Sequence, residues 1–235
     1  MRIVVTGASS GIGSELSQLL ARNGHALVLA ARRTEALTSV AEACRAAGAP
    51  EVAVVQWDAS NHAHRGRLTR GVEELSPNGE LGLVNAAGVA IFGEFATSDF
   101  NKIEEMVLTN LLGTMSATRE LLPLMLADRS GQVINVLSIS ATQSFPGAAG
   151  YCASKAGALA FTRALNAEVR TKGVRVSAVI PGAVDTPLWD GKGWVPPRED
   201  MLTPQAVAEA IRDLMHMPRD RSVDELHLMP PLGVL

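Results

Sequence analysis

The chain has 235 residues, of which 47% are hydrophobic and 19% are charged, and its formal net charge is −3 at pH 7. This length and composition fit one globular α/β domain whose core is large enough to need no disulfide or metal for stability. Because 21 basic residues are balanced by 24 acidic ones, bulk charge predicts neither a nucleic-acid partner nor a membrane-surface partner.

Cysteine content and hydropathy narrow the class of protein further. The two cysteines, Cys44 and Cys152, form neither a disulfide framework nor a metal-ligand spacing, which is typical of a reducing compartment. No run approaches the ~18 apolar residues of a membrane span, and the sequence starts with a strand pattern instead of a signal peptide. We therefore expect a cytoplasmic protein with no metal site and no membrane partner.

Short β-branched runs alternate with helical patterns along the whole chain. In chain order, the pattern predicts a strand at 3–5, a helix at 14–24, a strand at 25–31, a helix at 34–47, a strand at 51–57, a helix at 62–75, a strand at 81–88, helical structure in one or two pieces at 98–128, a strand at 131–138, a helix at 150–170, a strand at 173–182, a helix at 203–215 and a strand at 224–230. This alternation predicts a single α/β domain, residues 1–235, built on a doubly wound parallel sheet of about seven strands with helices on both faces.

One long irregular segment, residues 184–201, interrupts the alternation. It contains prolines, glycines and two tryptophans, Trp189 and Trp194. Structureless loops of ~15 residues or more are uncommon in compact domains unless they have a function, so the segment is either a lid over a binding site or a plain surface loop.

The first predicted strand leads into a glycine-rich turn and then a helix. The turn reads Thr6-Gly7-Ala8-Ser9-Ser10-Gly11-Ile12-Gly13, a G-x-x-x-G-x-G spacing. Glycines allow the backbone to turn sharply and to approach a pyrophosphate, whose charge is then bound by the N–H groups and dipole at the helix start. A flexible turn would also contain glycines, but their position directly after the first strand favours a dinucleotide site.

The end of the second predicted strand bears on the choice of dinucleotide. The sequence there is Leu29-Ala30-Ala31-Arg32-Arg33, without the carboxylate that NAD enzymes use to bind the ribose 2′-hydroxyl. An arginine suits a 2′-phosphate because its planar fork can donate two hydrogen bonds. The pattern favours NADP(H), the alternative being that Arg32 and Arg33 simply begin a solvated helix.

The only tyrosine, Tyr151, lies four residues before Lys155, one of only four lysines. Positions i and i+4 share one face of a helix, so the ammonium should lower the phenol pKa from about 10 toward working pH. A tyrosine tuned in this way is a proton donor to a carbonyl oxygen, although the pair could also lie on an ordinary amphipathic helix. Ser138 ends the fifth predicted strand, where a hydroxyl points into the crevice that binds ligands in doubly wound folds or merely satisfies local backbone.

Together these residues resemble the short-chain dehydrogenase/reductase family. Besides the features above, the chain contains Asn85-Ala86-Ala87-Gly88, Asn110 and Pro181-Gly182-Ala183-Val184-Asp185-Thr186, in the order that the family has them. The likeness extends from residue 2 to about residue 230. It implies a Rossmann-type fold and an NADP-preferring oxidoreductase that reduces a ketone or aldehyde to an alcohol by hydride transfer.

The resemblance also implies roles for single residues. Tyr151 would be the acid/base, Lys155 would lower its pKa and hold the nicotinamide ribose, and Ser138 would stabilise the developing oxyanion. Asn110 would kink its helix and hold a water in a proton relay to Lys155. The cofactor-binding residues that it implies are Gly7, Ser9, Ser10, Gly11, Ile12, Gly13, Arg32, Arg33, Asp58, Ala59, Asn85, Ala86, Gly88, Tyr151, Lys155, Pro181, Gly182, Val184 and Thr186.

Two positions depart from the family pattern. Ser10 stands where many NADP-preferring relatives have a basic residue, so Arg32, with help from Arg33, would bind the phosphate. Val84 stands where the family often has a further asparagine before Asn85, which changes none of the expectations above.

The substrate is the least determined part of the prediction. Phe92, Phe145, Leu188, Trp189 and Trp194 follow strand ends and suggest an apolar or aromatic carbonyl compound, unless the tryptophans only pack the lid. A 3-oxoacyl thioester reductase is an alternative. So is an NADP-sensing module without turnover, although a sensor needs no catalytic set. An epimerase or dehydratase is disfavoured, because the chain has no added substrate domain.

The helical region 106–126 carries apolar residues on more than one face. One face should cover the sheet, and the surplus predicts burial against another subunit. Together with the family resemblance, this predicts a homotetramer of D₂ symmetry, or a homodimer.

Overall fold

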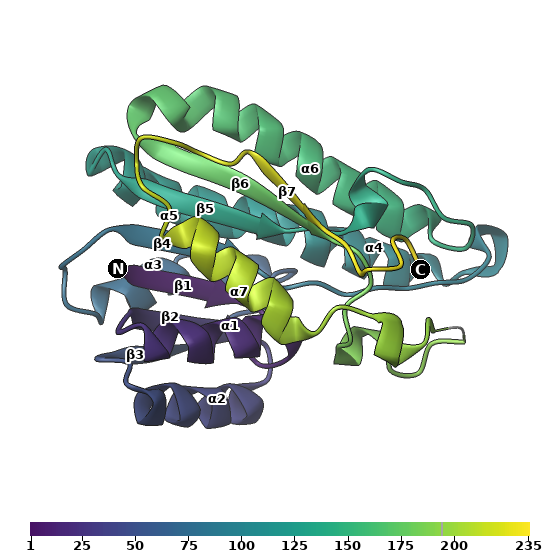
Figure 1. Ribbon diagram of the computed structural model, residues 1–235, viewed down its shortest axis with the longest axis horizontal. Helices are drawn as coiled ribbons and strands as arrows, with labels where there is room; N and C mark the ends of the chain where they lie inside the picture. The colour runs from purple at the N-terminus through teal and green to yellow at the C-terminus, as the bar shows by residue number, and fades with distance from the viewer. Residues whose placement is uncertain (194) are drawn as a thin grey trace.

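The computed structural model describes residues 1–193 and 195–235, and Trp194 lies outside the described residues. A seven-stranded sheet forms its centre, with strand order β3-β2-β1-β4-β5-β6-β7 (Figure 1). Each neighbouring pair of strands is parallel. The predicted doubly wound sheet is therefore confirmed.

The elements follow one another in the alternating order that the sequence predicts. The strands are β1 Arg2–Thr6, β2 Ala26–Ala31, β3 Val52–Gln56, β4 Leu81–Asn85, β5 Gly131–Val136, β6 Val174–Pro181 and β7 Glu225–Leu228. The α-helices are α1 Gly11–Arg22, α2 Thr34–Ala47, α3 Arg67–Glu73, α4 Phe100–Val107, α5 Thr114–Ala127, α6 Ala149–Val169 and α7 Pro204–Met215.

Alternate residues of each central strand enter different halves of the core. In β1, Ile3 and Val5 pack with residues of α1, α2 and α7, whereas Val4 packs with residues of α3, α5 and α6. Because side chains alternate between the faces of a strand, a strand covered on both faces is apolar throughout, as β1 is. Figure 1 shows α1 and α7 on the near side of the sheet, with α5 behind it.

The bounds of most predicted elements shift by one to three residues in the structure, and three of the differences have a clear local cause. The strands predicted at 81–88 and 131–138 end earlier, at Asn85 and Val136, because the residues that follow leave the sheet as loops. The single helix predicted at 62–75 is wrong. A short 3₁₀ turn, His62–His64, is separated from α3 by Gly66, whose φ of 81° breaks a right-handed helix.

The helical structure predicted at 98–128 is nearly continuous but irregular. α4 and α5 are joined by a π-helical segment, Leu108–Gly113. Within it the Asn110 carbonyl accepts a hydrogen bond of 3.0 Å from the Thr114 hydroxyl. π-segments of this kind are often found at functional sites.

The segment predicted as a lid has little regular structure. It contains two 3₁₀ turns, Pro187–Trp189 and Arg198–Asp200, and Val184 forms an isolated parallel bridge with Leu202. Across the described ranges, none of the helices is long and apolar enough to cross a bilayer.

Two histidines join the start of β2 to the end of α7. His216 Nδ1 lies 2.8 Å from the Arg212 carbonyl and must therefore donate to it, so His216 Nε2 accepts from His25 Nε2, 2.9 Å away. His25 Nδ1 then accepts from the Met1 amino group, 3.3 Å away. This series of hydrogen bonds requires both rings to be neutral. Burial, the positive amino group of Met1 and His216 all disfavour a positive charge on His25, so the pKa of His25 falls to about 4.

Acid should therefore weaken the fold at this joint. The unfolded chain binds a proton at His25 near pH 6.5 and the folded chain only near pH 4, so stability falls as pH falls through that window. After allowance for solvent screening, we expect the wild type to lose about 1–2 kcal/mol more than His25→Gln between pH 7 and pH 4.5. Urea unfolding at both pH values measures this difference. His227→Gln, which removes an exposed histidine, should leave the wild-type slope unchanged, and an equal slope for His25→Gln would contradict the assignment.

Candidate active site

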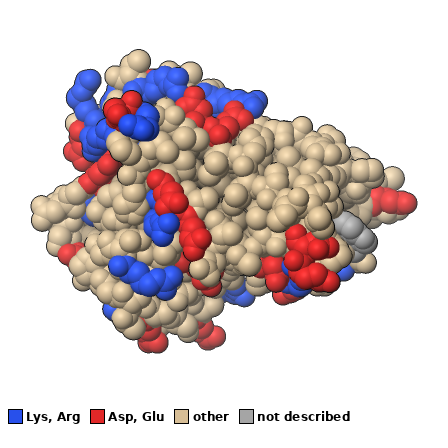
Figure 2. Space-filling model, viewed as in Figure 1, with Lys and Arg blue, Asp and Glu red and all other residues tan. Residues whose placement is uncertain are grey.

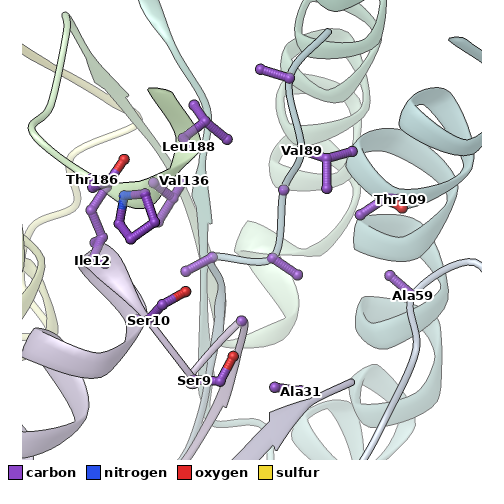
Figure 3. A pocket seen from close by; sticks show the side chains of 18 of the residues that line it. Ser9, Ser10, Ile12, Ala31, Ala59, Val89, Thr109, Val136, Thr186 and Leu188 are labelled. Carbon is purple, nitrogen blue, oxygen red and sulfur yellow. The ribbon is translucent and has the colours of Figure 1, made fainter. Parts of the chain in front are cut away.

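A cavity of about 490 Å³ opens at the C-terminal ends of the strands, where the loops after β1, β2, β3, β4 and β5 meet the segment predicted as a lid (Figure 3). It brings together most of the residues expected at a cofactor site: Gly7, Ser9, Ser10, Gly11, Ile12, Gly13, Arg32, Arg33, Asp58, Ala59, Ala86, Gly88, Tyr151, Lys155 and Thr186. Asn85, Asn110, Ser138, Pro181, Gly182 and Val184 do not line it.

The glycine turn forms one wall of the cavity. Helix α1 begins there at Gly11, and no acidic residue lies in its first turn, so the positive end of the helix dipole is not neutralised. A Cβ atom on Gly13 would lie only 2.4 Å from the Gly7 carbonyl oxygen, so only glycine allows the helix to start this close to the turn. Ser9, Ser10 and Ile12 are seen along this wall in Figure 3. A wall with these features is suited to an anion, because backbone N–H groups at a helix start can donate to it.

Two arginines line the mouth of the cavity directly after β2, which ends at Ala31. The guanidinium of Arg33 donates to the Ser10 hydroxyl at 3.3 Å, and that of Arg32 donates to the Glu105 carboxylate of α4 at 3.2 Å. Both arginines are exposed to solvent. Arg32 thus contacts α4, whereas Arg33 contacts the glycine turn.

The opposite wall combines the loop after β3 with the π-segment. The Asp58 carboxylate accepts hydrogen bonds from the backbone N–H and the hydroxyl of Ser60, at 2.9 and 2.8 Å, which hold it in place. Thr109 is 5% exposed and its hydroxyl has no hydrogen-bond partner within the protein. Figure 3 shows Thr109 and Ala59 next to each other on this wall. A buried hydroxyl without a partner is costly, so this group is suited to a ligand.

Tyr151 and Lys155 lie at the deep end of the cavity on the first turns of α6. Both side chains are buried, the Lys155 ammonium lies 5.9 Å from the centre of the Tyr151 ring, and it donates to the Val136 carbonyl at 3.2 Å. Burial lowers the pKa of Lys155 to about 8. Burial also raises the pKa of Tyr151 to about 12, although a hydrogen bond with Ser138 opposes the rise.

The expectation that Lys155 lowers the pKa of Tyr151 toward working pH is therefore wrong. Sequence spacing places the ammonium near the phenol, but it carries no information about desolvation, which is the larger effect here. Tyr151 remains a protonated phenol at neutral pH.

Ser138 and Asn110 lie just behind the cavity wall. The Ser138 hydroxyl accepts from the Ser140 backbone N–H at 3.1 Å and contacts Tyr151. The Asn110 amide exchanges two hydrogen bonds of 2.9 Å with the backbone of Val89 and donates to the Ser154 hydroxyl at 3.0 Å. Asn110 lies within the π-segment, where the helix is irregular, whereas the expected kink and the water relay to Lys155 stay predictions.

The other predicted cofactor residues outside the wall have structural partners. The Asn85 amide donates to the Thr118 hydroxyl at 3.1 Å and to the Asn135 side chain at 2.9 Å, so Asn85 supports the central strands from behind. Pro181 ends β6, and a Cβ atom on Gly182 would lie 2.7 Å from the Pro230 ring. Because these residues do not line the cavity, the structure does not support their direct contact with a cofactor.

Residues of the segment predicted as a lid line the cavity and pack near Tyr151. Lys192 donates to the Ala90 carbonyl at 2.6 Å, which joins the lid to the loop after β4. The Trp189 ring stacks on Phe92, with centroids 5.5 Å apart, and Phe92 packs edge-on against Tyr151 at 5.7 Å. These contacts support the interpretation of the segment as a lid. The prediction for Trp194 lies outside the described residues.

Several lining residues have no motif that would have revealed them: Trp57, Val89, Ala90, Thr109, Val136, Leu137, Pro187, Asp190 and Lys192. Most directly follow a strand or adjoin a recognised motif, so position relative to the strand ends was the only available signal.

The chain matches the family model described as short chain dehydrogenase over residues 1–193. It belongs to the short-chain dehydrogenase family. This short-chain dehydrogenase is 34% identical over 229 residues to an oxidoreductase of Staphylococcus saprophyticus, a match that covers 97% of this chain and 96% of the relative. It is 31% identical over 211 residues to the ketoacyl reductase HetN of Nostoc, covering 89% of this chain and 73% of HetN.

Among solved structures, the alcohol dehydrogenase of the archaeon Thermococcus sibiricus, complexed with 5-hydroxy-NADP, is similar with a TM-score of 0.88. Its sequence is 30% identical, and the match covers 98% of this chain and 96% of that one. The short-chain dehydrogenase is thus an oxidoreductase with a Rossmann-type sheet and a site for a nicotinamide dinucleotide.

Proposed function

We propose that this short-chain dehydrogenase reduces a ketone or aldehyde to an alcohol with NADP(H), with Tyr151 as the proton donor. The placement of Tyr151 carries the proposal. Its buried phenol lies beside Ser138 and Lys155, at one end of the cavity whose other end is lined by the glycine turn and two arginines.

The residues of the cavity fit a dinucleotide phosphate cofactor. The positive start of α1 suits a pyrophosphate, and the Thr109 hydroxyl, which has no protein partner, offers a hydrogen bond to a bound ring or ribose. At the mouth, the Arg33 guanidinium reaches the Ser10 hydroxyl. A positive charge therefore lies next to Ser10, where the sequence lacks the basic residue of many NADP-preferring relatives.

When bound, NADPH would supply the hydride, and the chain's own residues would supply the proton. Tyr151 is protonated at neutral pH because its pKa is about 12, so its hydroxyl can donate to the substrate oxygen as negative charge develops there. Ser138 would donate a second hydrogen bond to the same oxygen. Lys155, whose pKa of about 8 keeps it mostly charged at pH 7, would stabilise the phenolate that remains.

The surroundings of Tyr151 indicate the class of substrate. Phe92, Trp189 and Leu188 form an apolar surface around the phenol, together with Phe145. A flat apolar or aromatic carbonyl compound would bury its own surface there, with its oxygen toward Tyr151 and Ser138. The likeness to a ketoacyl reductase supports a 3-oxoacyl thioester as the second candidate.

A panel of aryl ketones, aliphatic aldehydes and 3-oxoacyl thioesters, scored by NADPH oxidation, distinguishes the two candidate substrate classes. Binding of NADPH without oxidation by any of them would favour a cofactor sensor.

Replacing Tyr151 by phenylalanine tests the proton donor. The ring of Tyr151→Phe still packs on Phe92, so NADPH should still bind, but carbonyl reduction should fall by at least ~10²-fold because the proton donor is gone. Steady-state kinetics give the turnover and a fluorescence titration gives the NADPH affinity. Turnover close to that of the wild type would rule out Tyr151 as the acid.

Comparing the two cofactors tests the role of the arginines. An arginine–phosphate pair is worth roughly 1.5–3 kcal/mol, so kcat/KM should favour NADPH over NADH by about ten- to a hundredfold. The double change Ala31→Asp with Arg32→Ala should reverse the preference, because the new carboxylate binds the 2′-hydroxyl and repels a phosphate. Equal efficiencies for the two cofactors in the wild type would show that Arg32 only begins a solvated helix.

The surface supports the proposal of a homo-oligomer. Met106, Leu121 and Met125 are buried inside the protein, whereas Leu112 and Met115 are 42% and 37% exposed on the adjoining face. Figure 2 shows a further broad area without charged side chains on the face that carries β7 and the C-terminal segment.

Light scattering tests self-association directly. At micromolar concentration the mass should be about four times the chain mass of 24.7 kDa, or twice that mass for a dimer. Leu112→Glu combined with Met115→Glu should shift the protein to smaller species, because two charges would be buried in the interface. A wild-type mass equal to that of one chain would refute the proposal.

A further inference from the structure

An ion pair between Arg32 and Glu105 lies beside the cavity, which Arg32 lines and Glu105 does not. Arg32 directly follows β2, and Glu105 lies on α4, four residues before the cavity residue Thr109. The single contact joins Arg32 Nη1 to Glu105 Oε1 at 3.2 Å, and the side chains are 50% and 54% exposed. The pair therefore joins the residues after β2 to α4, which is 73 residues away in the sequence.

Arg32 and Arg33 differ in the charge of their partners. Arg33 contacts the neutral Ser10 hydroxyl, and no acidic side chain in residues 1–193 and 195–235 forms an ion pair with it. Arg32 has its charge compensated by a carboxylate. The arginine that would meet a 2′-phosphate is thus already paired with an acid.

The geometry shows whether Glu105 orients Arg32 or competes for it. Elsewhere in this protein, Arg163 binds Glu225 through two nitrogen atoms, at 2.6 and 3.0 Å. The contact between Arg32 and Glu105 uses one nitrogen and one oxygen, and water reaches both groups. Such a pair does not fix the guanidinium, and another anion can exchange with the carboxylate.

We propose that Glu105 is a specificity-determining residue that weakens the preference for NADP(H) by competing with the 2′-phosphate for Arg32. This inference rests on the proposed binding of the phosphate by Arg32. A phosphate must displace the carboxylate, which then stays close by on α4 and repels the dianion. NAD(H), which has no 2′-phosphate, leaves the pair intact. Glu105 thus disfavours one cofactor and has little effect on the other.

Replacing Glu105 by glutamine tests the competition by direct binding measurements. Isothermal titration of Glu105→Gln should show NADPH and adenosine 2′,5′-bisphosphate binding roughly two- to fivefold more tightly than in the wild type. The affinity for NADH should stay within about twofold, and the gain should shrink in 1 M salt, where the screening length falls to about 3 Å. Because the pair is exposed, the melting temperature should not change.

Glu104 is the matched control. It is an exposed acid that adjoins Glu105 on α4 and makes no ion pair with Arg32. Glu104→Gln removes the same charge and should give at most a small gain for NADPH. In a protein that already carries Arg32→Ala, Glu105→Gln should raise the NADPH affinity no more than Glu104→Gln does. The guanidinium for which carboxylate and phosphate compete is then absent.

Each outcome separates this inference from the proposed cofactor preference. If Arg32→Ala weakens NADPH binding but Glu105→Gln matches Glu104→Gln, or binds NADPH less tightly, the competition is refuted and Arg32 keeps its role. If Arg32→Ala leaves NADPH affinity unchanged, the phosphate contact and the inference both fail. A gain for Glu105→Gln that persists in the Arg32→Ala background would also refute it.

Discussion

The pairing of β1 with β4 at the centre of the sheet is the constraint on which the rest of the structure depends. β1 pairs with β2 on one side and with β4 on the other, and Thr6 lies opposite Asn85 at the ends of the two strands. The chain therefore leaves these neighbouring strands in different directions and opens a crevice between them. A Cβ atom on Gly7 would lie 2.7 Å from the Ala86 carbonyl oxygen, so the two loops touch at the base of this crevice.

Buried polar side chains hold α6 against that centre. Asn85 donates to Asn135, and Asn135 donates to the Thr162 hydroxyl on α6 at 2.8 Å, so the chain of hydrogen bonds runs from β4 through β5 to the helix that carries Tyr151. Asn110 makes a second connection, from the loop after β4 to Ser154. Leaving any of these groups unpaired inside the protein would be costly, so the network fixes the position of α6 relative to the loops.

One end of the cavity is buried and the other is exposed to solvent. For Tyr151 and Lys155, burial is the largest cause of the pKa shift: it raises the pKa of the phenol and lowers that of the ammonium. At the mouth, the arginines contact partners that solvent also reaches, and their interactions are correspondingly weak and exchangeable. Electrostatic interactions are thus strong at the buried end, where a proton would be transferred. They are weaker at the exposed end, where NADP(H) would be distinguished from NAD(H).

The sequence alone determined the order of strands and helices, the doubly wound sheet and the place of the glycine turn, because these depend on burial patterns that repeat every two or four residues. Predictions from the sequence were wrong where tertiary contacts or backbone conformation, and not the local hydrophobic pattern, set the bounds of an element. Ala86 and Ala87 are apolar like a strand, yet they leave the sheet as part of the crevice. The helix predicted at 62–75 is interrupted at Gly66, whose conformation the hydrophobic pattern does not report.

Within the site, the sequence placed Tyr151 and Lys155 on one helix face, but only the tertiary structure decided their charge states. The pKa of Tyr151 depends on how completely other segments exclude water, and spacing along α6 says nothing about that. The contacts of Arg32 with Glu105 and of Lys192 with Ala90 join residues 73 and 102 positions apart. Such contacts form only after the sheet has brought distant loops to one edge, so no local pattern in the sequence could contain them.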